Sequence, residues 1–189
     1  MKSIEEKILA NGKIIDNDIL KVDSFLNHQI DIPTIREFAE EVARQFKGQR
    51  IDKVLTIETS GIAVAYAVCE ALGDIPMVFA KKKASKTVGS DVYRTSIKSF
   101  TRDVVTEVTV AQDYLNEGER VLLIDDFLAE GNAAFGLIHL CEQAGARVVG
   151  VAVVIEKLFQ GGRARLEEKG IRVFAGASIR TFHDNKPVF

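Results

Sequence analysis

Cysteine, a signal segment and membrane-length apolar runs are scarce or missing in this sequence. The chain of 189 residues has two cysteines, Cys69 and Cys141, and each lies within an apolar helical pattern, which predicts core-filling thiols. The charged N-terminus lacks an apolar signal core, and no apolar run approaches the roughly 20 residues that a membrane span requires. We therefore expect a cytoplasmic protein.

An excess of charge of one sign, internal repeats and low-complexity tracts are also missing. The formal net charge is -2, which gives no general affinity for nucleic acid. Hydrophobic residues make up 47% of the chain, which is enough for a substantial core. A folded chain of this length buries about 70% of its unfolded surface. These properties predict one domain spanning residues 1–189.

The most informative segment is the run of residues 121–134. Val121–Ile124 is apolar and predicts a buried strand, Asp125 and Asp126 stand where that strand should end, and a helix begins after Gly131. Unpaired N–H groups and the dipole at a helix start favour a phosphate. The acidic pair suits ribose hydroxyls or a divalent cation carried by pyrophosphate, although alone it is equally typical of a solvated strand end. The predicted phosphate loop consists of Ala129, Glu130, Gly131, Asn132 and Ala133.

Strands and helices alternate on both sides of this run. Val54–Ile57 predicts a strand, which Ser60-Gly61 turns into the helix Ile62–Leu72, and Met77–Ala80 predicts the next strand. Residues 81–103 are polar and predict a long connection that closes as a lid over the site. This alternation predicts an α/β fold with a parallel sheet covered by helices on both faces. A further helix is expected over 161–169, and further strands over 104–111, 147–155 and 171–174.

The first quarter of the chain has weaker patterns. Residues 1–10 predict a short amphipathic helix, and residues 12–32 mix apolar and polar positions irregularly. Thr34 is the predicted cap of a helix that extends to about Phe46, with Glu37 at the capping-box position.

Five segments carry a resemblance to a known family. Together with the run 121–134, they resemble the type I phosphoribosyltransferases, and in particular the bacterial xanthine phosphoribosyltransferases, over about residues 1–180. The resemblance implies the type I phosphoribosyltransferase fold, with a mostly parallel central sheet flanked by helices. It also implies a small base-binding hood from about residues 1–33 and the C-terminal segment. The five segments are residues 20–31, 56–63, 78–82, 124–129 and 154–157.

The resemblance also implies an activity and its partners. The enzymes of this family join a nucleobase to 5-phosphoribosyl-1-pyrophosphate (PRPP), and the expected products here are xanthosine 5'-monophosphate and pyrophosphate, a reaction of purine salvage. Mg2+ is expected to accompany PRPP, with no metal ligated by the protein directly. A homodimer is expected, with no nucleic-acid or membrane partner.

Roles at the sugar end follow from the resemblance. Asp125 and Asp126 are expected to hold the ribose hydroxyls as the catalytic pair, and the loop from Ala129 to Ala133 to cradle the 5-phosphate. Ser60 and Gly61 are expected to approach the pyrophosphate, since a glycine turn exposes N–H groups to an anion. Lys81 is a further pyrophosphate partner, in its own subunit or across a dimer interface, whereas Lys82 and Lys83 are expected to be solvated.

Roles at the base end involve residues far apart in the sequence. The positions matching Leu20, Asn27 and Lys157 are expected to contact xanthine, with Leu20 acting through its backbone. An ammonium at Lys157 would donate to the 6-oxo group of a purine and disfavour an amino group there. Phe127 and Phe159 are candidates for stacking on the purine, and core packing is the alternative for each.

The sequence departs from the family pattern in the phosphate loop. Glu130 and Ala133 replace threonines, so phosphate binding should rest on backbone N–H groups, with the Glu130 carboxylate turned away. Ala129 stands where hypoxanthine-guanine enzymes have an aspartate, so the general base is not identified. We expect xanthine to enter as an anion. The alternatives are a guanine or hypoxanthine phosphoribosyltransferase and, against the negative net charge, a PRPP-binding transcription regulator.

Overall fold

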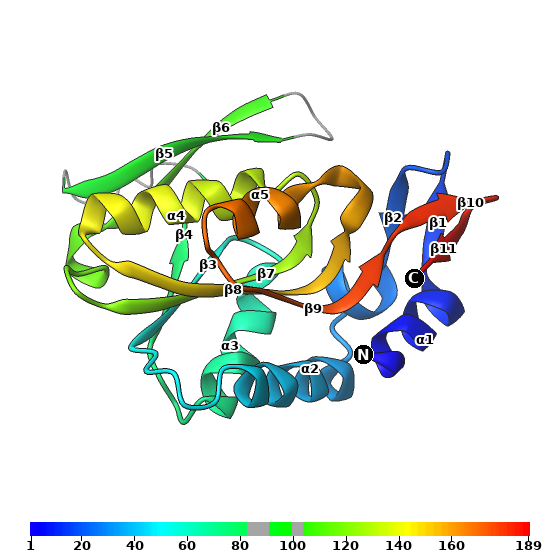
Figure 1. Cartoon of the computed structure of the whole chain (residues 1–189), viewed down its shortest axis with the longest axis horizontal. Coiled ribbons are helices and arrows are strands. Elements are labelled where there is room, and N and C mark those ends of the chain that lie inside the picture. Colours follow the sequence, from blue (N-terminus) through cyan, green and yellow to red (C-terminus); the bar gives the residue numbers. More distant parts are fainter. Residues whose placement is uncertain (83–90, 100–103) are drawn as a thin grey trace.

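A five-stranded parallel sheet forms the centre of the computed structural model, which describes residues 1–82, 91–99 and 104–189 (Figure 1). The strand order is β4-β3-β7-β8-β9, and every neighbouring pair is parallel. The predicted α/β class and parallel sheet are therefore confirmed. The strands are β3 (Lys53–Ile57), β4 (Met77–Ala80), β7 (Arg120–Leu128), β8 (Arg147–Lys157) and β9 (Val173–Ile179).

Helices cover both faces of this sheet. Residues of β7 alternate between the faces: Leu122 and Ile124 belong to the buried cluster beneath α1, α2 and α3, whereas Val121 and Leu123 belong to the cluster beneath α4 and α5. A strand buried on both faces has a continuous apolar sequence, which is why this one could be predicted. The helices are α1 (Lys2–Asn11), α2 (Ile32–Gln45), α3 (Gly61–Ala71), α4 (Asn132–Ala144) and α5 (Gly162–Glu168).

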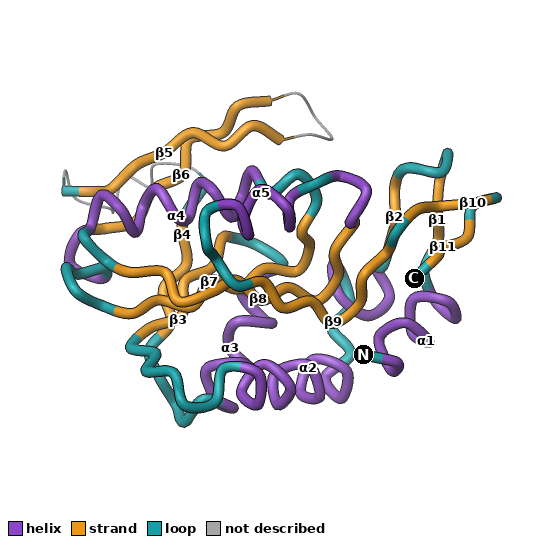
Figure 2. Tube along the Cα trace, in the orientation of Figure 1, coloured by secondary structure: helices purple, strands orange, loops and turns teal. Residues whose placement is uncertain are grey.

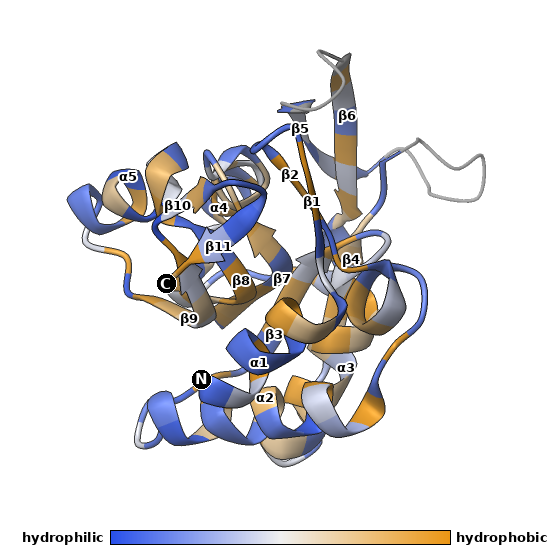
Figure 3. Cartoon of the chain, turned by 90° about the vertical axis from the view of Figure 1, so that its right-hand side faces the viewer, coloured by the Kyte–Doolittle hydropathy of each residue, from blue (hydrophilic) through white to orange (hydrophobic). Residues whose placement is uncertain are grey.

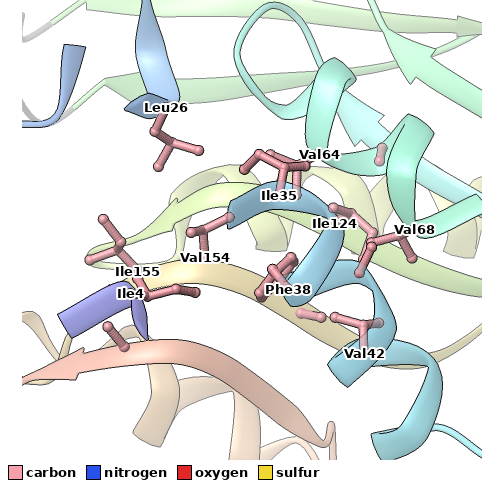
Figure 4. Close-up of a cluster of buried hydrophobic side chains, with 14 of the residues drawn as sticks. Ile4, Leu26, Ile35, Phe38, Val42, Val64, Val68, Ile124, Val154 and Ile155 are labelled. Carbon is pink, nitrogen blue, oxygen red and sulfur yellow. The ribbon is translucent and has the colours of Figure 1, made fainter. Parts of the chain in front are cut away.

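The larger cluster joins α2 and α3 to the middle of the sheet (Figure 4). Phe38 of α2 is fully buried, and Val64 and Val68 of α3 lie over Ile124 of β7 and Val154 of β8. Figure 3 shows that α3 is hydrophobic along most of its length. The close packing of these side chains fixes α3 against the sheet, and therefore fixes the turn that precedes it.

The chain reverses its direction across the sheet between β3 and β7. From β3 it continues to β4 on one side, and from β7 it continues to β8 and β9 on the other. In open parallel sheets, ligands bind outside the carboxyl ends of the strands at such a switch point. Residues 58–60 and 129–131, which follow these two strands, therefore lie at the expected binding position.

An antiparallel arm corrects the prediction for residues 81–103. Residues Val92–Ser99 form strand β5, which pairs along its whole length with β6 (Val104–Ala111), so this part is not a structureless connection. The backbone of Arg94 exchanges two hydrogen bonds with the side chain of Gln143 on α4, at 2.8 and 3.2 Å. Pairing with β6 and α4 overrides the polar composition. The remaining parts of the predicted lid, 83–90 and 100–103, lie outside the described residues.

Two hairpins near the chain ends lie side by side (Figure 2). The backbone N–H of Asn17 donates to the side-chain oxygen of Asn185 at 3.0 Å, and the N–H of Asn185 donates to that of Asn17 at 2.7 Å. Residues 12–32 are thus more regular than expected, and the C-terminal hairpin was not predicted. That these segments form a hood over the base stays a prediction. The hairpins are β1 (Lys13–Ile15) with β2 (Ile19–Lys21), and β10 (Thr181–His183) with β11 (Lys186–Val188).

The start of α2 differs from the expected cap. Asp31, not Thr34, is the N-cap, and its carboxylate accepts hydrogen bonds from the Thr34 N–H and hydroxyl at 3.0 and 2.5 Å. Lys7 of α1 donates to the same carboxylate at 2.8 Å. Asp31 therefore joins α1 to α2, a contact that the local capping pattern could not indicate.

The remaining short helices are a π-helix at Asp23–Asn27 and 3-10 turns at Gln112–Tyr114 and Leu158–Gln160. Both cysteines are buried as predicted, and burial raises the pKa of Cys69 to about 11 and that of Cys141 to about 12. No helix within the described ranges is long and apolar enough to span a membrane.

Candidate active site

The acidic pair lies two residues before the end of β7, whereas the sequence predicted that the strand ends at the pair. The strand continues through Asp125 and Asp126 to Leu128, because β7 pairs with β8 up to Glu156. The Asp126 N–H donates to Asp125 Oδ1 at 2.9 Å, and the Phe127 N–H donates to Asp126 Oδ1 at 3.0 Å. Each carboxylate thus accepts from the next backbone N–H, which orients both side chains at the carboxyl edge.

Asp125 is the carboxyl of this pair with an unusual pKa, and burial is the main cause. Burial raises the pKa of Asp125 well above the ordinary value, and the neighbouring Asp126 raises it further. The positive charge of Lys82 acts in the opposite direction. Two adjacent carboxyls at this edge of the sheet suit a site that holds sugar hydroxyls or a cation that arrives with a ligand.

The turn after β3 approaches this pair closely. A Cβ at Gly61 would lie 2.3 Å from Thr56 Oγ1 and 3.1 Å from Asp125 Oδ1, so only glycine fits where α3 begins. The structure therefore brings the predicted pyrophosphate turn, Ser60-Gly61, against the predicted ribose pair. The peptide bond between Glu58 and Thr59 in this turn is cis.

The predicted phosphate loop has the expected local geometry. Gly131 has a φ of 86°, in the left-handed region, and α4 begins at the next residue. Among the described residues, none accepts a hydrogen bond from the N–H groups of Glu130, Gly131 or Asn132. The side-chain amide of Asn132 donates to the Glu130 carboxylate at 3.0 Å. The loop thus offers successive free N–H groups, while the acidic side chain in it has a partner of its own.

Helix α5 supports the loop from behind, which the sequence analysis missed. The Gly162 N–H donates to the Ala129 carbonyl at 3.0 Å, and Arg165 Nη1 donates to the Glu130 carbonyl at 2.6 Å. A Cβ at Gly162 would lie 2.3 Å from the Ala129 carbonyl oxygen. The adjacent glycines 161 and 162 are the sequence signal that could have indicated this close approach.

A groove of about 1110 Å³ runs between α2 and α3 and includes two predicted site residues, Asn27 and Ser60, in its lining. Lys82 also lines it, and the Lys82 backbone N–H donates to Glu58 Oε1 at 2.5 Å. Lys82 was expected to be an ordinary solvated lysine; it is exposed, but it is also the lysine whose charge acts on Asp125.

Lys81 has a different environment. Its backbone N–H and carbonyl each bond to Thr109 of β6, at 2.9 and 3.0 Å. This bridge ties the end of β4 to the arm. The expected contact of Lys81 with pyrophosphate stays a prediction.

The predicted base residues Leu20 and Lys157 lie on the side of the terminal hairpins. Lys157 ends β8, and its Nζ donates to the Asp18 carbonyl at 2.7 Å and stands 5.6 Å from the centroid of the Phe182 ring. Burial lowers the pKa of Lys157, and the charge of Asp18 opposes this. The Leu20 side chain is buried in the core, which leaves its backbone as the part able to contact a ligand.

The two candidate stacking residues have different surroundings. Phe159 is 44% exposed and packs edge-on against Phe182, with ring centroids 5.4 Å apart. Phe127 is partly buried against the cluster beneath α2 and α3. Phe182, which the sequence analysis missed, joins Lys157 and Phe159 into one group; the alternation Thr181-Phe182-His183 was its only signal.

Comparison with known proteins agrees with this geometry. The family model described as "Phosphoribosyl transferase domain" matches residues 21–183. The chain is 49% identical to xanthine phosphoribosyltransferase 1 of Clostridium perfringens over 100% of both chains. It is also 49% identical to the xanthine phosphoribosyltransferase of Clostridioides difficile, over 100% of this chain and 98% of that protein.

Solved structures give the same fold at lower identity. The adenine phosphoribosyltransferase of Giardia lamblia, complexed with 9-deazaadenine, has a TM-score of 0.79 at 23% identity and covers 95% of this chain and 98% of its own. The adenine enzyme of Trypanosoma brucei, in complex with AMP, pyrophosphate and ribose-5-phosphate, has a TM-score of 0.77 at 16% identity, over 96% and 82% of the two chains.

Proposed function

The chain belongs to the phosphoribosyltransferase family, and on that premise we propose that it transfers the 5-phosphoribosyl group of PRPP to xanthine in purine salvage. The products are xanthosine 5'-monophosphate and pyrophosphate. The observation that carries the proposal is the loop of free N–H groups beside the half-buried acidic pair, at the switch point of the sheet. The full-length similarity to xanthine phosphoribosyltransferases supports the choice of base.

At the sugar end, the reaction is a displacement at the anomeric carbon. The N–H groups from Glu130 to Asn132 bind the 5-phosphate, and Asp125 and Asp126 hold the ribose hydroxyls so that this carbon faces the base. Ser60 and Gly61 approach the pyrophosphate with the N–H groups at the start of α3. A purine nitrogen forms the new bond as the bond to pyrophosphate breaks.

The donor set fits a magnesium ion that arrives on PRPP. Among the described residues, no group of three or more His, Cys, Asp or Glu side chains could hold a metal ion, and the proposal places the ion on the pyrophosphate of PRPP. Asp125 and Asp126 provide the hard oxygen atoms that such an ion prefers. When bound, Mg2+ neutralises charge on the leaving pyrophosphate.

At the base end, Lys157 discriminates between purines. An ammonium donates hydrogen bonds and accepts none, so it binds a 6-oxo group and rejects a 6-amino group. Asn27 offers both a donor and an acceptor for the 2-oxo edge, and the Leu20 backbone completes the set. Phe159, with its exposed face beside Lys157, is the better placed of the two stacking candidates.

The proposal includes a homodimer that covers the groove between α2 and α3. Tyr66 and Ile32 line this groove and are 60% and 56% exposed, so a partner seated there would cover two large apolar side chains. Lys81 reaches pyrophosphate in its own subunit or across this interface. The hairpins at the chain ends form the hood, and the chain is one domain.

The test is nucleotide formation from PRPP and Mg2+ with xanthine, guanine, hypoxanthine and adenine, measured side by side. The proposal expects pyrophosphate release with xanthine at the highest kcat/KM and the lowest value with adenine. A higher value with guanine or hypoxanthine would reassign the enzyme to that base. PRPP binding without pyrophosphate release on any purine would indicate a regulator.

A further inference from the structure

We propose that α5 is the element that positions the phosphate loop, with Arg165 as its key positioning residue; the inference rests on the proposed function. Helix α5 begins 29 residues after the end of the loop, and none of its residues is among those expected to contact substrate. They act by binding the outward-facing carbonyl groups of the loop.

Helix α5 is itself fixed to the sheet. Arg163 donates from Nε and Nη2 to the two oxygens of Glu156, at 2.7 and 2.8 Å, and from Nη1 to the Val173 carbonyl at 3.1 Å. Glu156 is only 1% exposed, and Ser178 of β9 donates to it at 2.5 Å. A paired, buried carboxylate with three donors holds the helix in one position.

The contacts with α5 also fix the direction in which the peptide groups of the loop point. In a planar trans peptide, the carbonyl oxygen and the following N–H point in opposite directions. Gly162 binds the Ala129 carbonyl, so the Glu130 N–H points away from α5. Arg165 binds the Glu130 carbonyl, so the Gly131 N–H points away from the Arg165 guanidinium. The two contacts together turn successive N–H groups to the side where a phosphate would bind.

Arg165 of α5 and Lys169, the residue that follows α5, form a matched pair of cations. Arg165 and Lys169 both lie over the Phe135 ring of α4, at 4.6 and 5.8 Å from its centroid, and both are exposed. Only Arg165 also binds a loop carbonyl. Lys169→Ala therefore removes a similar charge and ring contact while leaving the loop contact in place.

The experiment measures PRPP affinity by calorimetry without base, together with kcat and both KM values, for wild type, Arg165→Ala, Arg165→Lys and Lys169→Ala. We expect Arg165→Ala to weaken PRPP binding about tenfold, with the KM for xanthine and the thermal midpoint close to wild type. Arg165→Lys should restore part of the loss, and Lys169→Ala should match wild type.

Unchanged PRPP affinity in Arg165→Ala, or an equal loss in Lys169→Ala, would overturn the positioning role. A parallel rise in both KM values with a lowered thermal midpoint would also overturn it, because that result indicates general destabilisation. A wild-type chain that binds PRPP but does not consume xanthine would contradict the proposed function alone, and the binding comparison would still test Arg165.

Discussion

The residues proposed for the sugar end of the site and those proposed for the base end are held in different ways. Asp125, Asp126 and the loop that ends at Ala133 form one continuous segment, and α5 supports that segment through backbone carbonyls. Leu20, Asn27 and Lys157 come from opposite ends of the chain, and Lys157 reaches its place by binding the carbonyl of Asp18, 139 residues earlier. On the proposed assignment, the chemistry common to the family is local in the sequence, while the choice of base depends on long-range contacts.

The largest expected effect is at the sugar end. Asp126→Asn should lower kcat on the order of 100-fold, because an amide holds the ribose and its shared cation less well than a carboxylate does. The fold should persist, since the Asn side-chain oxygen can still accept the Phe127 N–H. Steady-state kinetics and thermal unfolding of Asp126→Asn would be compared with those of Asp113→Asn, a control variant whose exposed side chain lies in a 3-10 turn. Wild-type turnover in Asp126→Asn would remove the pair from the mechanism.

The next largest effect is expected at Glu156. Glu156 precedes Lys157 and binds Arg163, so Glu156→Gln should lower the free energy of unfolding by about 2 kcal/mol, since it leaves Arg163 without its buried counter-charge. Chemical denaturation would measure the loss. Glu167→Gln, which touches the same guanidinium at an exposed position, is the control, and an equal loss in both variants would argue against a special role for burial.

At the base end, Lys157→Gln should raise the KM for xanthine about tenfold, because a charged hydrogen bond to the base is lost. The KM for PRPP should not change. Lys186→Gln, an exposed lysine of the C-terminal hairpin, is the control for loss of charge near the hood. If xanthine binds Lys157→Gln as well as wild type, Lys157 is not the residue that reads the base.

The smallest effect is expected at Asp31, which joins α1 to α2. Hydrogen bonds from Lys7 and Thr34 lower the pKa of Asp31 from 3.8 to about 2. A lowered pKa in the folded state stabilises the protein above the unfolded value, and this contribution is lost as pH falls from about 4 to about 2. Asp31→Ala should therefore cost about 1 kcal/mol at neutral pH and less at acidic pH. If Asp31→Ala lowered the free energy of unfolding equally at neutral and at acidic pH, the pH dependence expected from the lowered pKa would be contradicted.

The local features of the fold could be predicted from the sequence. The run Val121–Ile124 is apolar at every position because both faces of β7 are buried, and the helix after Gly131 begins where the left-handed glycine allows it. The strand extends two residues beyond the acidic pair, because pairing with β8 continues to Leu128.

What the sequence could not indicate depends on partners far along the chain. Asp31, rather than Thr34, is the N-cap of α2, and Lys7 of α1 donates a hydrogen bond to the Asp31 carboxylate. Strand β5 forms because it pairs with β6, although its polar composition does not favour a strand. The support of Glu130 by Arg165 is a contact across 35 residues with no local pattern.

The most direct test of whether the two ends of the site act separately is to measure both the KM for xanthine and the KM for PRPP in Lys157→Gln and in Arg165→Ala. We predict that Lys157→Gln raises only the KM for xanthine and that Arg165→Ala raises only the KM for PRPP, each about tenfold. If each variant raised both values by the same factor, the two ends would not be separate, and the account would be contradicted.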